Sequence, residues 1–200
     1  FTAKYGVKVR DWRSSSENVV QRVISETRAN KRDVDFIENN SPEMEALRRE
    51  KMLRTMNSPY FADMRPGTLG AHHTYATSTI DVFVQAYNTD RVKKAELPRS
   101  FEDLADPRWK DRLGVEAEDF AWFGTLVETM GQEKGLRLWR DIVAKNGLSV
   151  RKGHTLLAQL VATGEVPMGL SAYNYKPPQL KEKGAAIDWV VLQPAVGPLH

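Results

Sequence analysis

The stretch LSAYNYKPP, residues 170–178, places two phenols and an amide where a buried strand should end. The apolar run 166–170 predicts the strand, and the two prolines that follow stop it because proline lacks a backbone N–H. Tyr173 and Tyr175 share one face of an extended chain, and Asn174 lies on the other. Because a strand end meets solvent or a ligand, we expect these three residues to line a binding site.

Polar side chains also follow the other predicted strands. Strand-like and helix-like segments alternate along the chain, which predicts the α/β class with parallel strands and helices on both faces of a sheet. In such sheets ligands bind beyond the carboxyl ends of the strands, near helix N-termini. The residues at these junctions that we expect to bind a ligand are Arg13, Ser14, Ser15, Asn40, Asp119, Trp122, His154 and Thr155.

Several of these residues also have an ordinary structural explanation. Ser14, Ser15 and Asn40 could simply cap helices, because hydroxyls and amides are preferred at N-caps. His154 could be a cap or a surface residue, and Trp122, with a phenylalanine close by on either side, could belong to the core. The sequence leaves both explanations open for each residue.

The apolar spacing assigns the elements that must hold these residues in place. Helices are predicted from Ser14–Ser16 onward through Thr27, from Ser41 to about Leu53, and at 100–103, 120–130, 134–145, 153–163 and 179–183. Strands or extended segments are predicted at 7–12, 34–37, 74–87, around Val115, and at 148–151, 166–172 and 187–192.

The composition excludes several classes of protein. The 200 residues contain no cysteine, which rules out disulfides, a cysteine nucleophile and a thiolate zinc site. The net charge is only +3 and basic residues are well mixed with acidic ones, whereas nucleic-acid-binding surfaces cluster basic residues more strongly. No apolar run approaches the roughly 18 residues of a membrane span. We therefore expect no nucleic-acid partner and no membrane-spanning segment.

Catalytic motifs are also absent from the sequence. It contains no nucleophile elbow, phosphate-binding loop, GxGxxG or HExxH. His154 and Asp119 could form an acid–base pair, but no nucleophile stands at a motif position. We therefore expect a protein that is not an enzyme and has no cofactor and no metal site, with a small-molecule enzyme using His154 and Asp119 as an alternative.

Several segments carry a resemblance to a known family. LPRSFEDLADPRWKDRLG, residues 97–114, is the most specific of them, and FTAKYGVKV at the start, AYNTD at 86–90 and GHTLLAQLVATGEVPMGLSAYNY at 153–175 follow in the same order. Together they resemble periplasmic solute-binding proteins of ABC importers, in the branch that includes the ferric-iron-binding proteins. The similarity runs along essentially the whole chain.

The resemblance implies a two-lobe α/β fold of type II, with a small solute held between lobes that crossover strands join. Lobe one would be residues 1–86, with 194–200 returning to it, and lobe two 87–193. Members usually have a strand and a helix before, and helices after, the segments matched here, so we expect a partial chain without the first strand and the C-terminal helices. The resemblance further implies a periplasmic monomer that passes its solute to a membrane permease, although a sensor or chaperone lobe could use the same cleft.

The resemblance also bears on the identity of the solute. Ferric-binding members use two consecutive tyrosines and a carboxylate. Here Tyr175 matches the second tyrosine, Asn174 stands at the first, and Asn40 stands at the carboxylate position, with Glu38 close to it. Amides are poor ligands for a bare ferric ion, which prefers anionic oxygen ligands. We therefore expect an organic or anionic solute, with ferric iron as the alternative.

Overall fold

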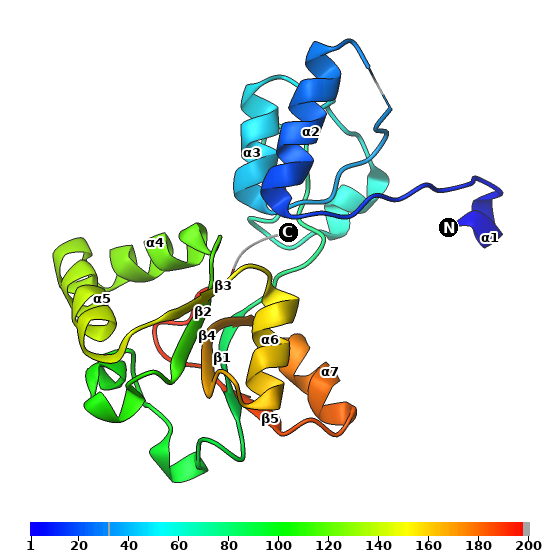
Figure 1. Cartoon of the computed structure of the whole chain (residues 1–200). Helices are drawn as coiled ribbons and strands as arrows, with labels where there is room; N and C mark the ends of the chain where they lie inside the picture. The colour runs from blue at the N-terminus through cyan, green and yellow to red at the C-terminus, as the bar shows by residue number, and fades with distance from the viewer. Residues whose placement is uncertain (32, 198–200) are drawn as a thin grey trace. The chain divides into compact units, whose positions relative to one another are not determined.

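The computed structural model describes residues 1–31 and 33–197, and the chain divides into two compact units (Figure 1). Unit 1 is Phe1–Ser78 and unit 2 begins at Thr79. Only unit 2 contains a β-sheet among the described residues, and the two units have separate hydrophobic cores.

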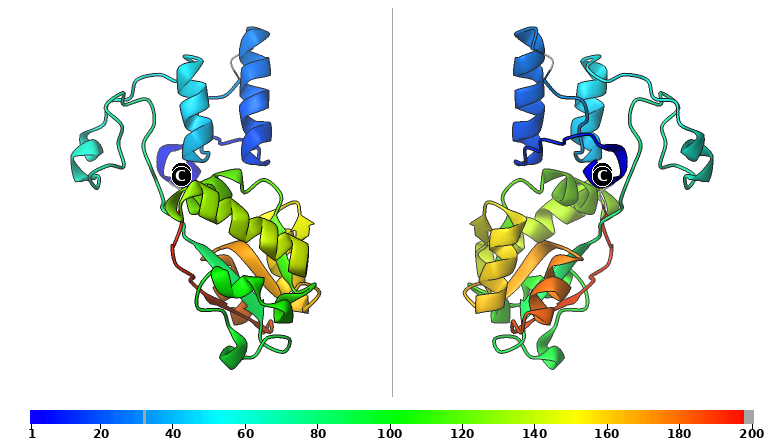
Figure 2. Two further views of the ribbon diagram at one scale, coloured as in Figure 1. Left: turned by 90° about the vertical axis from the view of Figure 1, so that its left-hand side faces the viewer. Right: turned by 90° about the vertical axis from the view of Figure 1, so that its right-hand side faces the viewer.

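Unit 1 is built on two helices that lie side by side (Figure 2). Helices α2 (Ser16–Arg28) and α3 (Ser41–Arg49) bury Val20 and Val23 against Met44 and Leu47, because these apolar residues recur at helical spacing. The unit also contains the short helix α1 (Thr2–Tyr5) and the 3-10 helix η1 (Pro59–Asp63). The two predicted helices of this unit are thus confirmed.

The two strands predicted in unit 1 are wrong. Residues 7–12 and 34–37 form no strand, and Val9, Trp12 and Phe36 are 56%, 50% and 81% exposed. A strand needs a neighbour for its backbone hydrogen bonds and a surface on which to bury one face. No other strand lies in the described part of unit 1 to supply either, so the alternation of apolar and polar residues does not produce a strand here.

Unit 2 contains a five-stranded mixed sheet in the order β3-β2-β4-β1-β5. β2 (Leu113–Glu116) runs parallel to β3 (Ser149–Arg151) and to β4 (Met168–Tyr173), as predicted. However, β1 (Phe83–Asn88) is antiparallel to both β4 and β5 (Ile187–Val190), which corrects the prediction of parallel strands. β1 begins at the edge of the sheet where β4 ends, because Phe83 pairs with Tyr173. The chain therefore runs through β1 in the direction opposite to β4.

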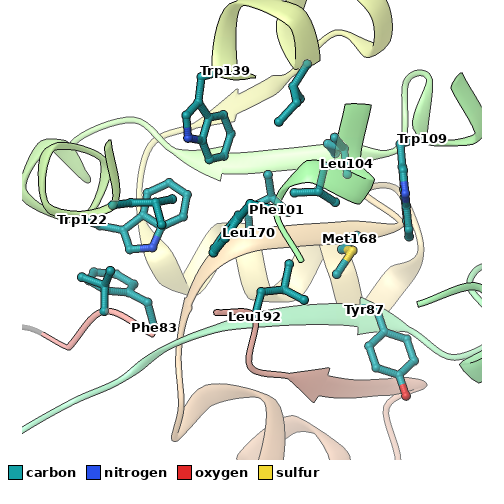
Figure 3. Close-up of a cluster of buried hydrophobic side chains, with 14 of the residues drawn as sticks. Phe83, Tyr87, Phe101, Leu104, Trp109, Trp122, Trp139, Met168, Leu170 and Leu192 are labelled. Carbon is teal, nitrogen blue, oxygen red and sulfur yellow. The ribbon is translucent and has the colours of Figure 1, made fainter. Parts of the chain in front are cut away.

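Helices cover both faces of the sheet (Figure 1). On one face, α4 (Phe120–Thr129) and α5 (Gln132–Asn146) pack with the 3-10 helices η3 (Glu102–Ala105) and η4 (Pro107–Trp109) over the aromatic core in Figure 3. On the other face lie α6 (His154–Thr163) and α7 (Lys176–Glu182). The short 3-10 helix η2 (Lys94–Glu96) follows β1. The α/β class predicted from the sequence is confirmed.

The specific segment 97–114 supplies core residues to unit 2. Phe101, Leu104 and Trp109 are at most 1% exposed. Asn146, at the end of α5, donates hydrogen bonds from Nδ2 to the carbonyl oxygens of Leu104 and Asp106, at 2.7 and 2.9 Å. These contacts explain why the segment needs its aromatic and aliphatic residues.

The division into units cuts the chain earlier than the predicted lobe boundary at residues 86 and 87. Residues 83–86 belong to β1, an inner strand of the sheet in unit 2. Of the segment predicted to return to lobe one, the described residues 194–197 lie with unit 2, where the Phe83 N–H donates to the Val196 carbonyl. How the chain divides into functional lobes stays a prediction.

Candidate functional site

One edge of the sheet in unit 2 gathers side chains from four elements. β2 and β4 are parallel, so their carboxyl ends, Glu116 and Tyr173, lie at the same edge. β1 begins there with Phe83, and α6 begins there with His154. This edge is therefore where the topology brings most of the predicted binding residues of unit 2 together.

An acidic pair and an imidazole form the polar part of this edge. One side-chain atom each from Glu116, Asp119 and His154 lie within 4.8 Å of one another. His154 Nε2 is 3.2 Å from Asp119 Oδ1, and its Nδ1 is 3.3 Å from the carbonyl oxygen of Ser171. The Asp119 side chain is only 8% exposed, and its second oxygen, Oδ2, is buried without a hydrogen-bond partner among the described residues.

Glu116 is held by backbone groups from two loops. Its Oε1 accepts a hydrogen bond from the Gly153 N–H at 2.8 Å, and its Oε2 accepts one from the Glu118 N–H at 2.6 Å. Its own N–H donates to the Ser171 hydroxyl at 3.1 Å. Glu116 therefore ties the loop after β2 to the start of α6, which fixes Asp119 and His154 relative to each other.

The charges in this cluster change the pKa values of the neighbouring groups. Burial lowers the pKa of His154, but the hydrogen bond and charge of Asp119, the charge of Glu116 and the Ser171 carbonyl raise it by more, so the net pKa lies above 6.5. Burial raises the pKa of Tyr173 far above 10, and the negative charge of Asp119 adds to this. At neutral pH the Tyr173 hydroxyl therefore keeps its proton.

Four aromatic rings form a row along the same edge. Tyr173 stacks on Phe83 and on Tyr175, with ring centroids 5.1 and 5.8 Å apart, and its ring is 4.2 Å from that of His154. Beyond Phe83, the Trp122 ring follows at 6.1 Å. Trp122 is 3% exposed and Tyr175 is 40% exposed, so this aromatic row, Trp122–Phe83–Tyr173–Tyr175, runs from the core to the surface.

The structure brings four of the predicted residues of unit 2 together: Asp119, His154, Tyr173 and Tyr175. Trp122 belongs to the hydrophobic core and its ring adjoins the aromatic row, and ligand binding by Trp122, Asn174 and Thr155 stays a prediction. Asn174 joins the end of β4 to the residue before β1: its N–H donates to the Val82 carbonyl at 2.9 Å, and its Oδ1 accepts from the Val82 N–H at 3.3 Å. Thr155 is exposed in the first turn of α6.

The predicted residues of unit 1 lie at the starts of its helices. Ser15 is the N-cap of α2, where its hydroxyl accepts from the Asn18 N–H at 3.4 Å, and the Ser14 hydroxyl accepts from Asn18 Nδ2 at 3.1 Å. Asn40 is the N-cap of α3 but makes no side-chain capping hydrogen bond, and Arg13 is exposed. Capping thus accounts for Ser15, while ligand binding by the four residues stays a prediction.

The prediction missed two residues of this edge, Glu116 and Phe83. Glu116 directly follows the apolar Val115 in the sequence, so a carboxylate that ends a predicted strand was a usable signal. Phe83 is placed beside Tyr173 by antiparallel pairing between distant segments, which no local pattern reveals.

A cavity of about 620 Å³ borders the acidic pair on the side of α4 and α5. Its wall is largely apolar and includes Phe120, Leu136 and Trp139, with Glu116 and Asp119 among its few polar residues. Asp119 is therefore part of the cavity wall as well as the partner of His154.

Comparison with known proteins identifies the family. A sequence profile described as bacterial extracellular solute-binding protein matches residues 37–199. The chain belongs to this family. The resemblance to periplasmic solute-binding proteins that the sequence motifs suggested is therefore confirmed.

Other members of the family and similar structures agree with this assignment. The Fe(3+)-binding periplasmic protein of Serratia marcescens is 28% identical over 180 residues, which cover 88% of this chain and 52% of that protein. Iron-bound HitA from Pseudomonas aeruginosa superposes with a TM-score of 0.79 at 25% identity, over 95% of this chain and 62% of HitA. An ABC transporter substrate-binding protein from Bradyrhizobium japonicum shares the fold, with a TM-score of 0.79 at 15% identity, over 99% of this chain and 63% of that one.

The chain thus spans about half the length of the Serratia protein and less than two thirds of HitA. Within the part of the chain that the structure describes, no helix is both long and apolar enough to cross a membrane.

Proposed function

We propose that this protein is the solute-binding component of an ABC importer in the periplasm, and that its solute binds at the edge of unit 2 formed by Asp119, His154, Tyr173 and Tyr175. The observation that carries the proposal is the convergence of these four side chains at the carboxyl ends of β2 and β4, in a member of the extracellular solute-binding family. Ligands of open α/β sheets bind at such edges.

The aromatic row favours an organic solute. Tyr175 is 40% exposed and stacks on Tyr173, and Lys176 Nζ lies 5.4 Å from the centre of the Tyr175 ring. Flat faces of this kind pack against a carbon skeleton, while the nearby imidazole and carboxylates can fix its polar groups. The solute would leave unchanged, because the His154–Asp119 pair has no nucleophile at a motif position beside it.

A ferric ion is the second candidate. The Serratia protein is named for Fe(3+) binding, HitA carries iron in its structure, and in this chain Tyr173 ends β4 and Tyr175 precedes α7. A bare ferric ion prefers anionic oxygen ligands, whereas the resemblance puts the amides Asn174 and Asn40 where a tyrosine and a carboxylate are expected. This difference supports an organic solute as the first candidate and iron as the second.

Further parts of the proposal follow from the family and from the residues. The protein would act as a monomer, deliver its solute to a membrane permease and bind no nucleic acid. Ligand binding by Arg13, Ser14, Ser15 and Asn40 of unit 1 is also part of the proposal.

Native mass spectrometry of the purified 200-residue chain tests this function. We expect an adduct with the mass of one small organic molecule, which is released unchanged on denaturation. An iron adduct together with a visible phenolate-to-iron absorption band would favour the second candidate. Conversion of the released molecule by fresh protein, with loss of that activity in His154→Ala, would overturn the proposal.

A further inference from the structure

Glu116, Asp119 and His154 have the residue types, spacing and support of a metal site, and the geometry points to a binding site for a divalent zinc-type cation formed by these three side chains. One potential ligand atom from each lies within 4.8 Å of the other two. Asp119 and His154 also belong to the proposed solute site, but binding of a cation by the three side chains does not require that a solute binds to the aromatic row.

The orientation of His154 is the first argument. Its Nδ1 faces the Ser171 carbonyl at 3.3 Å and its Nε2 faces Asp119 Oδ1 at 3.2 Å, so both ring nitrogens face acceptors. An imidazolium would donate to both acceptors, whereas the neutral imidazole, which is the form that binds a metal, has one N–H and can satisfy only one of them. If the His154 Nδ1–H donates to the Ser171 carbonyl, the lone pair of Nε2 points at the Asp119 carboxylate. A cation bound by Nε2 and by this carboxylate would then satisfy both groups. Metal-binding histidines are commonly oriented by such a hydrogen bond from the second nitrogen.

The unpaired oxygen of Asp119 is the second, independent argument. The side chain is 8% exposed, and Oδ2 is buried with no hydrogen-bond partner among the described residues. Buried carboxylate oxygens are normally paired, because losing hydration without a replacement costs free energy. A bound cation would supply the missing partner.

Glu116 is already positioned as a ligand should be. Each of its oxygens accepts one backbone hydrogen bond, from Gly153 and from Glu118, and each still has a free lone pair. Carboxylate ligands are typically held by such outer contacts, which limit their motion before the metal arrives.

The ligand set indicates the class of metal. One imidazole nitrogen with two carboxylates suits Zn²⁺, Co²⁺ or Mn²⁺, whereas Ca²⁺ and Mg²⁺ prefer oxygen alone. The site differs from a ferric site built on phenolates, because no tyrosine belongs to the trio. Three protein ligands leave at least one coordination position for water or another ligand.

Calorimetric titration of the untagged 200-residue chain with ZnCl₂, after removal of metals by a chelator, tests the inference. We expect saturable binding of one equivalent. Affinity should fall at least tenfold in His154→Gln and in Asp119→Asn, because losing even an outer-shell contact costs metal sites about 10- to 100-fold. The matched controls are Glu118→Gln, which changes an acid in the same loop outside the trio, and a triple glutamine variant of the remaining histidines, His72, His73 and His200. Both controls should keep the wild-type affinity.

A second measurement does not depend on whether the variants fold. Mn²⁺ added to the wild-type chain should broaden the NMR amide signals of Ala117–Asp119 and Gly153–His154 before any others, because its paramagnetic effect acts at short range. Absence of one-equivalent Zn²⁺ binding would overturn the inference. So would binding that is lost in the triple histidine variant but kept in His154→Gln, or Mn²⁺ broadening centred on His72 and His73.

Discussion

Trp122 and Tyr175 stand at opposite ends of the aromatic row and should respond in opposite ways to truncation. Trp122 is 3% exposed and its ring lies 5.6 Å from that of Trp139 and 6.1 Å from that of Phe83. Removing a buried aromatic of this kind costs about 3–5 kcal/mol of unfolding free energy. Tyr175 is 40% exposed, so its truncation should cost mainly its stacking on Tyr173, about 0.5–1.5 kcal/mol.

These energies convert into a clear difference in thermal midpoint. For a unit of this size, 1 kcal/mol corresponds to about 3–5 °C, so Trp122→Ala should lower the ligand-free midpoint by about 10–25 °C and Tyr175→Ala by only a few degrees. Truncation of Tyr175 should instead weaken solute binding. Tyr175→Ala should lose about 1–3 kcal/mol of binding free energy, roughly a tenfold to hundredfold weakening of affinity.

Circular dichroism gives the midpoints, and calorimetry with the solute eluted from the purified chain gives the affinity. Tyr175→Phe is the matched control, because it keeps the stacked ring and removes only the hydroxyl. A large drop in the midpoint of Tyr175→Ala with unchanged affinity would refute the reasoning and make Tyr175 a packing residue.

Three further predictions concern single side chains. The pKa of His154 is raised, so its contribution to stability is complete below pH 6.5 and is lost as the pH rises through the pKa of the folded state. Urea unfolding at a series of pH values, with chelator present, should show this loss of unfolding free energy. Asp119→Asn should remove most of this pH dependence. Asn174→Ala should cost about 1–3 kcal/mol of unfolding free energy, because it leaves the Val82 N–H without its acceptor, but calorimetry should show solute affinity close to wild type. The pKa of Glu45 is lowered to about 2 by hydrogen bonds to two arginines, so its contribution to stability is present above pH 4.5 and is lost as the pH falls toward 2, which an NMR titration of its carboxyl carbon should follow.

The helices were predictable because their signals are local. The spacing of Val20 and Val23, the capping residues before α3 and the glycines that follow α5 and α6 act within a few residues of the element they define. The class of fold followed from the order of these elements.

The strands were predicted less well because a strand depends on its neighbours. Residues 7–12 and 34–37 have the pattern of strands but no partner in the described part of unit 1. The direction of β1 depends on its pairing with β4 and β5, segments that lie more than 80 residues away. Local sequence contains neither fact.

The candidate site was partly predictable, because some of its residues follow from local sequence and others depend on distant contacts. The polar residues that follow strands identified Asp119, His154, Tyr173 and Tyr175, because parallel strands end at one edge. The same rule could not tell that Asn174 bonds to Val82 or that Trp122 packs into the core, since these contacts depend on three-dimensional packing.

The central claim is that a small solute binds at the edge formed by the acidic pair, His154 and the two tyrosines. NMR amide spectra of the chain as purified, compared with the same chain after unfolding, dialysis and refolding to remove bound molecules, test it most directly. The account predicts that shift changes in unit 2 cluster at Ala117–Asp119, Gly153–Thr155 and Tyr173–Tyr175. Changes in unit 2 that cluster instead along α5 at Leu136–Ala144, with those three segments unchanged, would contradict it.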